Sequence, residues 1–250
     1  MAGHSKWANI KHRKGAADKR RASLFTKLAR VITVAAREGG GDPEMNFNLR
    51  LAVDKARAAN MPKDNIERAI ARGTGAEKGE QLERVVYEGY GPASVAIMVA
   101  TTTDNRNRTV GLVRSAFNKY GGNLGENGSV AWQFEQRGVI QVPADGIDPD
   151  DLALAAIDAG ALDVELGDEV VTVVTDPAAF RGVKAALTAA GYNTDDATLS
   201  MVSTVPMDLD DDQTLKVLKF IDILEDIDDV DEVYTNASFS DAAVEQFAMS

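Results

Sequence analysis

Three short helices are predicted in the first part of the chain, because apolar residues recur there with helical spacing. In the first helix, over residues 16–37, the inward positions are Leu24, Leu28, Val31 and Ala35. The Lys and Arg residues of that segment fall on the opposite face, which we expect to face solvent. The same spacing predicts helices over 46–59 and 61–70, and Gly73 is expected to end the third. These helices make a small helical domain.

After residue 82 the pattern changes to strands alternating with helices. Strands are predicted over 85–87, 95–100, 130–134 and 139–142, with a helix from Asp104 or Asn105 to Tyr120. The alternation of Val130, Trp132 and Phe134 with more polar residues indicates a half-buried strand.

The segment between Pro143 and Val205 has its own pattern. Helices are predicted over 150–159 and 178–190, and strands over 163–166, 170–175 and 199–205. Counting the strand at Val139, the order is strand, helix, strand, strand, helix, strand, which is a ferredoxin-like plan. A helix over 211–226 and a strand over 230–236 then supply what the segment 82–135 lacks for a similar plan.

The predicted fold is therefore mixed α/β (α+β) with three domains. An N-terminal three-helix domain is followed by two ferredoxin-like α/β domains, the last inserted into the middle one. The predicted limits are 1–76 for the helical domain, 77–137 and 206–250 for the discontinuous middle domain, and 138–205 for the acidic inserted domain.

Charge is distributed unevenly along the chain. Residues 1–72 contain 16 Lys+Arg and 7 Asp+Glu, a net charge of +9. The whole chain carries −12, so the remaining residues carry −21. A basic block is attracted to polyphosphate, whereas the acidic remainder is repelled by it. We therefore expect nucleic acid as the partner, met by the N-terminal end of the protein.

Composition excludes several classes of protein. The absence of cysteine removes disulfides, thiolate metal sites and cysteine nucleophiles. The apolar run over 95–100 is far shorter than the roughly 20 residues of a membrane span. Lys6 and Lys11 stand where a secretory signal would need its apolar core. We expect a cytoplasmic protein with no membrane partner, no cofactor and no small-molecule substrate.

The first 14 residues show neither helical nor strand spacing, and we expect a mobile basic arm. Aromatic side chains alternate there with cations, a combination that stacks on unpaired bases and holds phosphates. Two interpretations of Trp7 stay open: a base-stacking residue, or a hydrophobic plug that docks the arm onto the helices. The predicted nucleic-acid-binding residues of the arm and first helix are Lys6, Trp7, Lys11, His12, Arg13, Lys14, Lys19, Arg20, Arg21, Lys27 and Arg30.

Two arginines open the helix predicted after Asp104. The ordinary interpretation of segment 103–109 is a capped helix start. However, Arg106 and Arg108 lie in the first turn, where the helix dipole favours anions. We predict that these two arginines form a second phosphate contact on the middle domain.

Several segments resemble catalytic or metal-binding motifs but lack residues that those motifs require. The acidic run 208–212 resembles the start of a calcium loop, but Gln213 and Lys219 replace its glycine and glutamate. The glycines that follow residue 120 come after a helix and before a strand, the reverse of a phosphate loop. His4 and His12 both lie on the arm, which disfavours a buried histidine base and a zinc site. We predict no metal site, no catalytic residue and no enzymatic activity.

Six longer segments are more specific than any single motif. They are MAGHSKWANIKHRKGAAD at 1–18, NMPKDNIERAIARGTG at 60–75, YEGYGP at 87–92, TDNRNRT at 103–109, NGSVAWQFEQRGVI at 127–140 and LEDIDDVDEVYTN at 224–236. Through these segments the chain resembles the YebC family, which includes bacterial proteins and a mitochondrial translational activator. Similar members often carry Arg-Gly-Lys where this chain has Arg21-Ala22-Ser23. No cation is therefore carried over to Ser23, and Lys19 is an additional one.

The resemblance implies a helical first domain, two α/β domains with a discontinuous middle one, and no cofactor or catalytic residue. Some members are labelled probable transcriptional regulators or described as DNA-binding. Others act in translation, where they bind the ribosome and relieve stalling at proline-rich sequences. We therefore expect a translation factor that binds rRNA or tRNA on the ribosome, with its acidic domains against basic ribosomal proteins. The alternative is a transcriptional regulator that binds duplex DNA by the same basic face. The few Asn and Gln on the basic helix favour backbone contacts over base reading.

Overall fold

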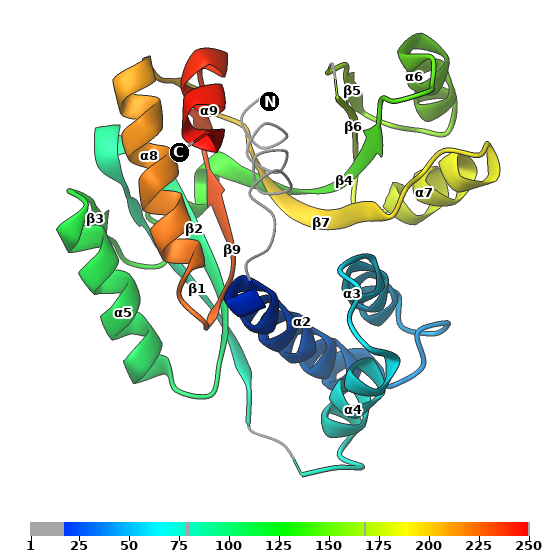
Figure 1. The fold of residues 1–250 in the computed structure, drawn as a ribbon, viewed down its shortest axis with the longest axis horizontal. Coiled ribbons are helices and arrows are strands. Elements are labelled where there is room, and N and C mark those ends of the chain that lie inside the picture. The colour runs from blue at the N-terminus through cyan, green and yellow to red at the C-terminus, as the bar shows by residue number, and fades with distance from the viewer. Residues whose placement is uncertain (1–17, 79–80, 168, 250) are drawn as a thin grey trace.

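The computed structural model describes residues 18–78, 81–167 and 169–249, which form a helical part and two α/β parts (Figure 1). The helical part consists of α2 (Asp18–Gly39), α3 (Phe47–Ala58) and α4 (Lys63–Thr74). One apolar cluster holds the three helices together, and Ile32 and Leu49 are fully buried in it. The three predicted helices are confirmed. The predicted stop at Gly73 is wrong, because α4 continues to Thr74 and Gly75 ends it in the left-handed conformation, with φ 81°.

Asn46 fixes the turn between the first two helices. Its side-chain oxygen accepts a hydrogen bond from the Leu49 amide (3.1 Å) and so caps α3. Its amide nitrogen donates to the carbonyls of Ala35 and Gly40, both at 2.8 Å, near the end of α2. The side chain therefore satisfies backbone groups of both helices and sets the angle between them.

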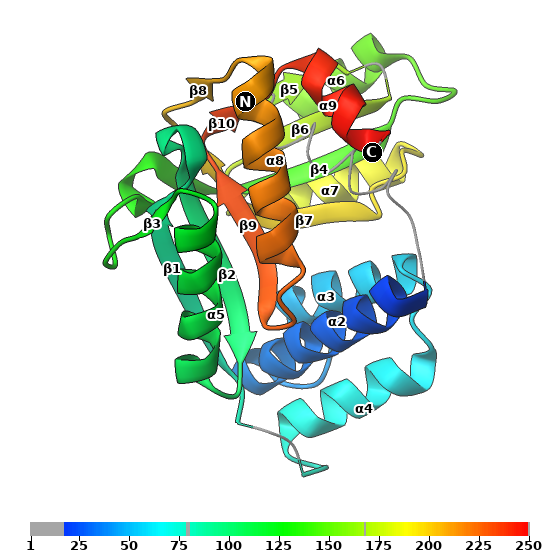
Figure 2. The ribbon, with the colours of Figure 1, turned by 60° about the vertical axis from the view of Figure 1, so that its left-hand side comes forward.

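The middle α/β part is a four-stranded sheet with two helices on one face (Figures 1 and 2). Its elements are β1 (Glu83–Tyr90), β2 (Ala96–Thr103), α5 (Arg106–Lys119), β3 (Asn123–Leu124), α8 (Asp211–Glu225) and β9 (Val230–Thr235). The strand order is β3-β1-β2-β9, with every neighbouring pair antiparallel. Phe117 of α5 and Phe220 of α8 meet edge to face with ring centroids 5.0 Å apart, so the two helices share one core with the sheet.

The second α/β part lies between these elements in the sequence. It consists of β4 (Phe134–Pro143), α6 (Pro149–Asp158), β5 (Asp163–Glu165), β6 (Val170–Thr175), α7 (Phe180–Ala189) and β7 (Asp196–Ser203). Its antiparallel sheet has the order β5-β6-β4-β7, which is the strand order of the ferredoxin-like plan.

The two sheets have equivalent orders, since β3, β1, β2 and β9 take the places of β5, β6, β4 and β7. The two sheets differ in chain order at one position. In the middle part the strand at that position, β1, comes first in the chain, whereas the corresponding strand of the inserted unit, β6, comes after β4 and α6. The middle sheet is completed only when the chain returns through α8 to β9. The predicted fold class, with one ferredoxin-like unit inserted into another, is confirmed. The exact domain limits at residues 76, 137 and 205 stay predictions.

The strand predicted over 130–134 is wrong. Residues Ala131–Gln133 form a short 3-10 helix, η2, and Trp132 is 67% exposed. The alternation of apolar and more polar residues over 130–134 led to a wrong strand prediction, because a buried carboxylate, Glu88, binds the backbone of this loop. A second short 3-10 helix, η1 (Pro92–Ser94), connects β1 to β2. Three further features were not predicted: β3, the parallel pair of β8 (Met207–Asp208) with β10 (Ala237–Ser238), and α9 (Asp241–Ala248).

The helical part packs against both α/β parts. α2 lies beside the α8–β9 turn, and α3 lies beside the inserted sheet (Figure 2). Phe47 of α3 meets Phe180 of α7 edge to face at 5.8 Å, and Lys184 Nζ lies 3.5 Å from Asp54 Oδ2. None of the helices in the described ranges is both long enough and apolar enough to cross a membrane.

Candidate nucleic-acid interface

The cations of α2 that the structure describes do not face solvent freely. The Lys27 ammonium donates to the carbonyl of Glu225. Arg30 donates to the Asp228 carbonyl at 3.0 Å and to Asp229 Oδ1 at 2.9 Å. This corrects the expectation of a solvent-facing basic side for Lys27 and Arg30. Their charges hold α2 against the α8–β9 turn, because the turn offers carbonyl and carboxylate acceptors. Their role in nucleic-acid binding stays a prediction.

Asp229 is the centre of the contact between α2 and the middle part. Its carboxylate is 4% exposed. Arg108 Nη2 lies 2.8 Å from Oδ2 and 3.0 Å from Oδ1, and Arg108 Nε lies 3.2 Å from Oδ2. Thr109 donates to Oδ2 at 2.8 Å. With Arg30 on Oδ1, one buried carboxylate receives donors from α2 and from the first turn of α5.

These donors set the protonation of Asp229. Burial alone would raise the pKa of this carboxyl, but the hydrogen bonds from Arg108 and Thr109 and the charges of Arg108 and Arg30 outweigh burial. The pKa of Asp229 is therefore lowered below its usual range, and the carboxylate stays charged at neutral pH. Arg108 also lies 2.6 Å from Asp104 Oδ1, and its pKa is raised by its hydrogen bonds to Asp229 and Asp104.

The two arginines predicted as phosphate contacts on the middle part, Arg106 and Arg108, therefore differ in their contacts. Arg108 contacts two carboxylates of its own chain, so the observed structure explains an arginine in this turn without a bound anion. Arg106 is exposed, and among the described residues no carboxylate pairs with its guanidinium. It lines an open pocket with Arg84, Glu88 and Asn127. Both arginines stay predicted binding residues, with Arg106 the more available of the two.

The rest of the predicted basic arm lies outside the described residues. This applies to Lys6, Trp7, Lys11, His12, Arg13 and Lys14, and to the side chains of Lys19, Arg20 and Arg21, whose backbone begins α2. Among the predicted residues that are described, the structure brings together Arg30 and Arg108 through Asp229.

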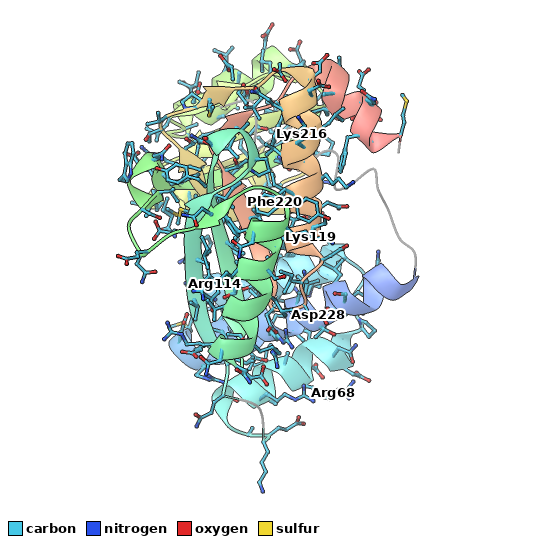
Figure 3. All side chains as sticks on the ribbon, turned by 90° about the vertical axis from the view of Figure 1, so that its left-hand side faces the viewer. Arg68, Arg114, Lys119, Lys216, Phe220 and Asp228 are labelled. Carbon is cyan, nitrogen blue, oxygen red and sulfur yellow. The ribbon has the colours of Figure 1, made fainter. Side chains whose placement is uncertain are left out.

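Sequence reasoning missed two further cations on α5. Arg114 and Lys119 are exposed on the same helix as Arg106, and Lys119 Nζ lies 5.6 Å from the ring centroid of Tyr120. Figure 3 shows both side chains on the side of the molecule that also carries Lys216 of α8. The absence of acidic residues from this helix was a sequence feature that could have identified them.

A buried carboxylate also positions an exposed aromatic side chain. Glu88 of β1 accepts hydrogen bonds from the amides of Gly128 (2.7 Å), Val130 (2.9 Å) and Ala131 (2.8 Å). Burial would raise the pKa of Glu88, but these three backbone bonds lower it overall. The loop so fixed presents Trp132, whose indole N–H donates to the Ser129 carbonyl at 3.2 Å. Trp132 is 67% exposed, so its indole is accessible for stacking.

Comparisons with known proteins cover nearly the whole chain. Residues 5–76 match the family model described as the TACO1/YebC protein N-terminal domain, and residues 82–237 match the model of the TACO1/YebC second and third domain. A relative from Thermomicrobium roseum is 55% identical over 240 residues, covering 96% of this chain and 97% of its own. One from Shewanella oneidensis is 55% identical over 246 residues, covering 98% and 99%. Both are named probable transcriptional regulatory proteins.

A solved structure agrees with the fold. The crystal structure of a conserved hypothetical protein from Aquifex aeolicus superposes with a TM-score of 0.84 at 44% identity, covering 90% of this chain and 93% of that one. Sequence relatives, domain models and structure agree from the helical part through the inserted unit to β9. The chain belongs to the TACO1/YebC family.

Proposed function

We propose that this protein is a non-enzymatic, nucleic-acid-binding regulator of gene expression that acts in translation. In this proposal it binds rRNA or tRNA on the ribosome in the cytoplasm and relieves stalling at proline-rich sequences. The observation that carries the proposal is the charge division, +9 over residues 1–72 against −21 over the rest. A phosphate-rich partner attracts the first part and repels the second, so it selects one orientation of the molecule.

The contacts of α2 support the arm as the place of the initial phosphate contacts in this proposal. Lys27 and Arg30 already donate to the α8–β9 turn, so the initial phosphate contacts fall to the arm, Lys6 to Lys14, and to the cluster Lys19 to Arg21. Lys27 and Arg30 contribute by holding the helical part in a fixed orientation on the α/β parts. The regulatory names of the relatives support a nucleic-acid-binding regulator and offer no enzymatic activity.

The acidic parts have a separate role in this proposal. They keep most of the molecular surface away from phosphate and are suited to basic ribosomal proteins. Bound RNA is positioned by the N-terminal part while the acidic parts contact protein. The proposed result is positioning of the RNA without any covalent chemistry.

The second candidate function is transcriptional regulation through duplex DNA, because the relatives carry the name of probable transcriptional regulators. The arm and the basic helix would again make the contacts. Their cations suit phosphates, whereas a sequence-specific regulator also needs side chains that bind base edges. DNA binding would then depend strongly on salt and weakly on sequence.

The test compares ribosome sedimentation with titrations of rRNA and promoter DNA at physiological salt. Replacement of Lys6, Lys11, Arg13 and Lys14 by Glu should abolish ribosome association. A control replaces four exposed cations elsewhere, Lys55, Arg57, Lys63 and Lys78, by Glu and should retain it. Unchanged association of the arm variant would refute the proposal. A preference of at least ~10³ for a specific DNA sequence would favour the transcriptional function instead.

A further inference from the structure

We propose that the outer face of α5 is a second docking surface for a nucleic-acid backbone, with Arg106, Arg114 and Lys119 as its phosphate contacts. Only Arg106 belongs to the set predicted from sequence. The inference rests on the proposed function as a nucleic-acid binder and adds a site on the middle part, outside the basic arm.

Charge is the first observation. Residues 105–125 contain four Lys or Arg and no Asp or Glu, in a chain with 39 Asp+Glu among 250 residues. Residues 126–250, which follow this segment, hold 27 Asp+Glu and only 5 Lys+Arg, so this helix and the turn after it contrast with the acidic remainder of the chain. A local cationic surface within an acidic part attracts a polyanion to one defined place.

The second observation is that these cations are available. Arg108 is held by Asp104 and Asp229, but no carboxylate of the described residues pairs with Arg106, Arg114 or Lys119. All three side chains belong to exposed residues. The helix therefore uses one cation to fix its own position and leaves three for a partner.

The third observation is a glycine without an intramolecular role. Gly111 lies within α5, is exposed, and has no heavy atom of the described residues within 4 Å of the position that a Cβ would take. By contrast, a Cβ on Gly73 would lie 2.4 Å from the Thr33 carbonyl oxygen, so packing explains that glycine. Glycine weakens a helix interior, yet it allows another backbone to approach closely.

Small and amide side chains continue this surface. Asn107, Ser115 and Asn118 are exposed and lie on the face of Gly111 by the three- and four-residue spacing of a helix. Such side chains donate to phosphate and sugar oxygens. A phosphate backbone lying along this face would meet hydrogen-bond donors at Asn107 and Asn118 and cations at either side.

α5 is held firmly by contacts within the chain, and it is long enough to lie along a short stretch of nucleic-acid backbone. Asn105 caps it, Arg108 binds Asp229, and Phe117 packs on Phe220. At about 1.5 Å per residue, Arg106 and Lys119 are about 20 Å apart along the helix axis, which corresponds to about six base-pair steps of about 3.4 Å along the axis of a duplex. The surface thus matches a short stretch of continuous backbone.

The experiment measures binding of the full chain to an RNA duplex, a DNA duplex of the same sequence and a single-stranded RNA, between about 50 and 200 mM salt. The variant R114Q/K119Q is compared with K55Q/K63Q, which removes the same charge from α3 and α4. For the backbone form that binds at α5, we expect R114Q/K119Q to weaken binding at least about 5-fold at the low-salt end and to reduce the salt slope by about 2. Thermal unfolding of both variants should equal that of the unaltered protein.

The three probes decide which backbone form is bound, and the controls separate the two proposals. Equal affinities and salt slopes for R114Q/K119Q and K55Q/K63Q on every probe would overturn the α5 surface. If the arm variant loses binding in the same assays while R114Q/K119Q does not, the proposed function stands and only the α5 inference fails. If the unaltered chain binds none of the probes and no ribosomes, both proposals fail.

Discussion

Arg108 and Asp229 form a two-point ion pair, in which Arg108 Nη2 and Nε lie 2.8 and 3.2 Å from Asp229 Oδ2. Arg30 contacts the other oxygen, Oδ1, at 2.9 Å. Asp229 stands just before β9, Arg108 in the first turn of α5, and Arg30 in the middle of α2. One carboxylate therefore links the helical part to the middle part, and its charge is needed because two guanidinium groups converge on it.

Replacing Asp229 by Asn should destabilise the protein by about 2–3 kcal/mol at pH 7, because two arginines lose a largely buried partner. The pKa of Asp229 is lowered, so its contribution to stability is present above the ordinary Asp pKa of 3.8 and is lost as pH falls through the lower folded value. Urea unfolding at pH 7 and near pH 3 should therefore show a difference that shrinks in acid. Asp226→Asn, an exposed change near the same turn, is the control; equal stability of the two variants would contradict the linking role.

Asp231 should have the opposite pH dependence. Burial raises its pKa to about 6, despite the hydrogen bond from Thr102 Oγ1 at 2.6 Å and the charges of Arg84 and Lys27. Its Oδ1 atom is buried, and no described residue donates a hydrogen bond to it. The folded protein therefore takes up a proton between about pH 6 and the ordinary value of 3.8, where the unfolded chain does not, and this carboxyl lowers stability as pH rises through that window.

Asp231→Asn should therefore raise the free energy of unfolding at pH 7.5 by up to about 3 kcal/mol, and the gain should disappear near pH 4. Chemical denaturation at the two pH values measures it, with the exposed change Asp195→Asn as the control. A loss of stability at pH 7.5 would show that the charged form of Asp231 is needed.

Glu88→Gln should loosen the loop that carries Trp132, because an amide cannot accept all three backbone N–H groups as a carboxylate does. We expect a loss of about 2 kcal/mol in stability and a change in the emission of Trp132. The chain has two tryptophans, so the measurement is made in a Trp7→Phe background. Glu126→Gln, an exposed change in the same loop, should leave the emission unchanged; identical spectra for both variants would contradict the role of Glu88.

Gly111→Ala should stabilise the protein by about 0.5–1 kcal/mol, because alanine is the better helix former and the added methyl group meets open space. Nucleic-acid binding should weaken nonetheless if a backbone approaches α5 closely. Gly182→Ala is a matched control, since Gly182 lies within α7 and a Cβ added there would also have no heavy atom within 4 Å in the part of the chain that the structure describes. Its neighbours Arg181 and Lys184 contact α3, so nucleic-acid binding by this variant should be unaffected. Equal affinity of both variants would argue against close approach at Gly111.

Local spacing predicted most of the fold because most elements satisfy their own periodic pattern. The strand over 170–175 was predicted at the bounds of β6, and the nested arrangement followed from counting elements. Segment 130–134 was misassigned because a carboxylate about 40 residues away in sequence binds its backbone, and alternation carries no information on such a partner. The strands β8 and β10 have two residues each and pair between segments distant in the sequence, so no local pattern of apolar residues predicts them.

The candidate site was predicted less completely than the fold. Composition located the basic end of the chain, but it could not show that Lys27 and Arg30 bind the α8–β9 turn. Arg106 and Arg108 are unusual in a first helical turn because the dipole disfavours cations there, but the sequence could not show that Asp229, about 120 residues later, neutralises one of them. Arg114 and Lys119 were overlooked because the dipole argument applies only to the first turn of a helix, and both residues lie beyond it.

The way in which the chain enters and leaves the inserted unit has a consequence for how freely that unit can be exchanged. Phe134, the first residue of β4, is paired across the ladder with Ser203, the last residue of β7. The two ends of the inserted unit are therefore paired residues of adjacent strands, and a tight reverse turn could connect them without stretching the remaining chain. Removal of the unit should leave the middle part with a continuous chain. This region of the fold is therefore suited to the exchange of one inserted unit for another, in evolution or by protein engineering.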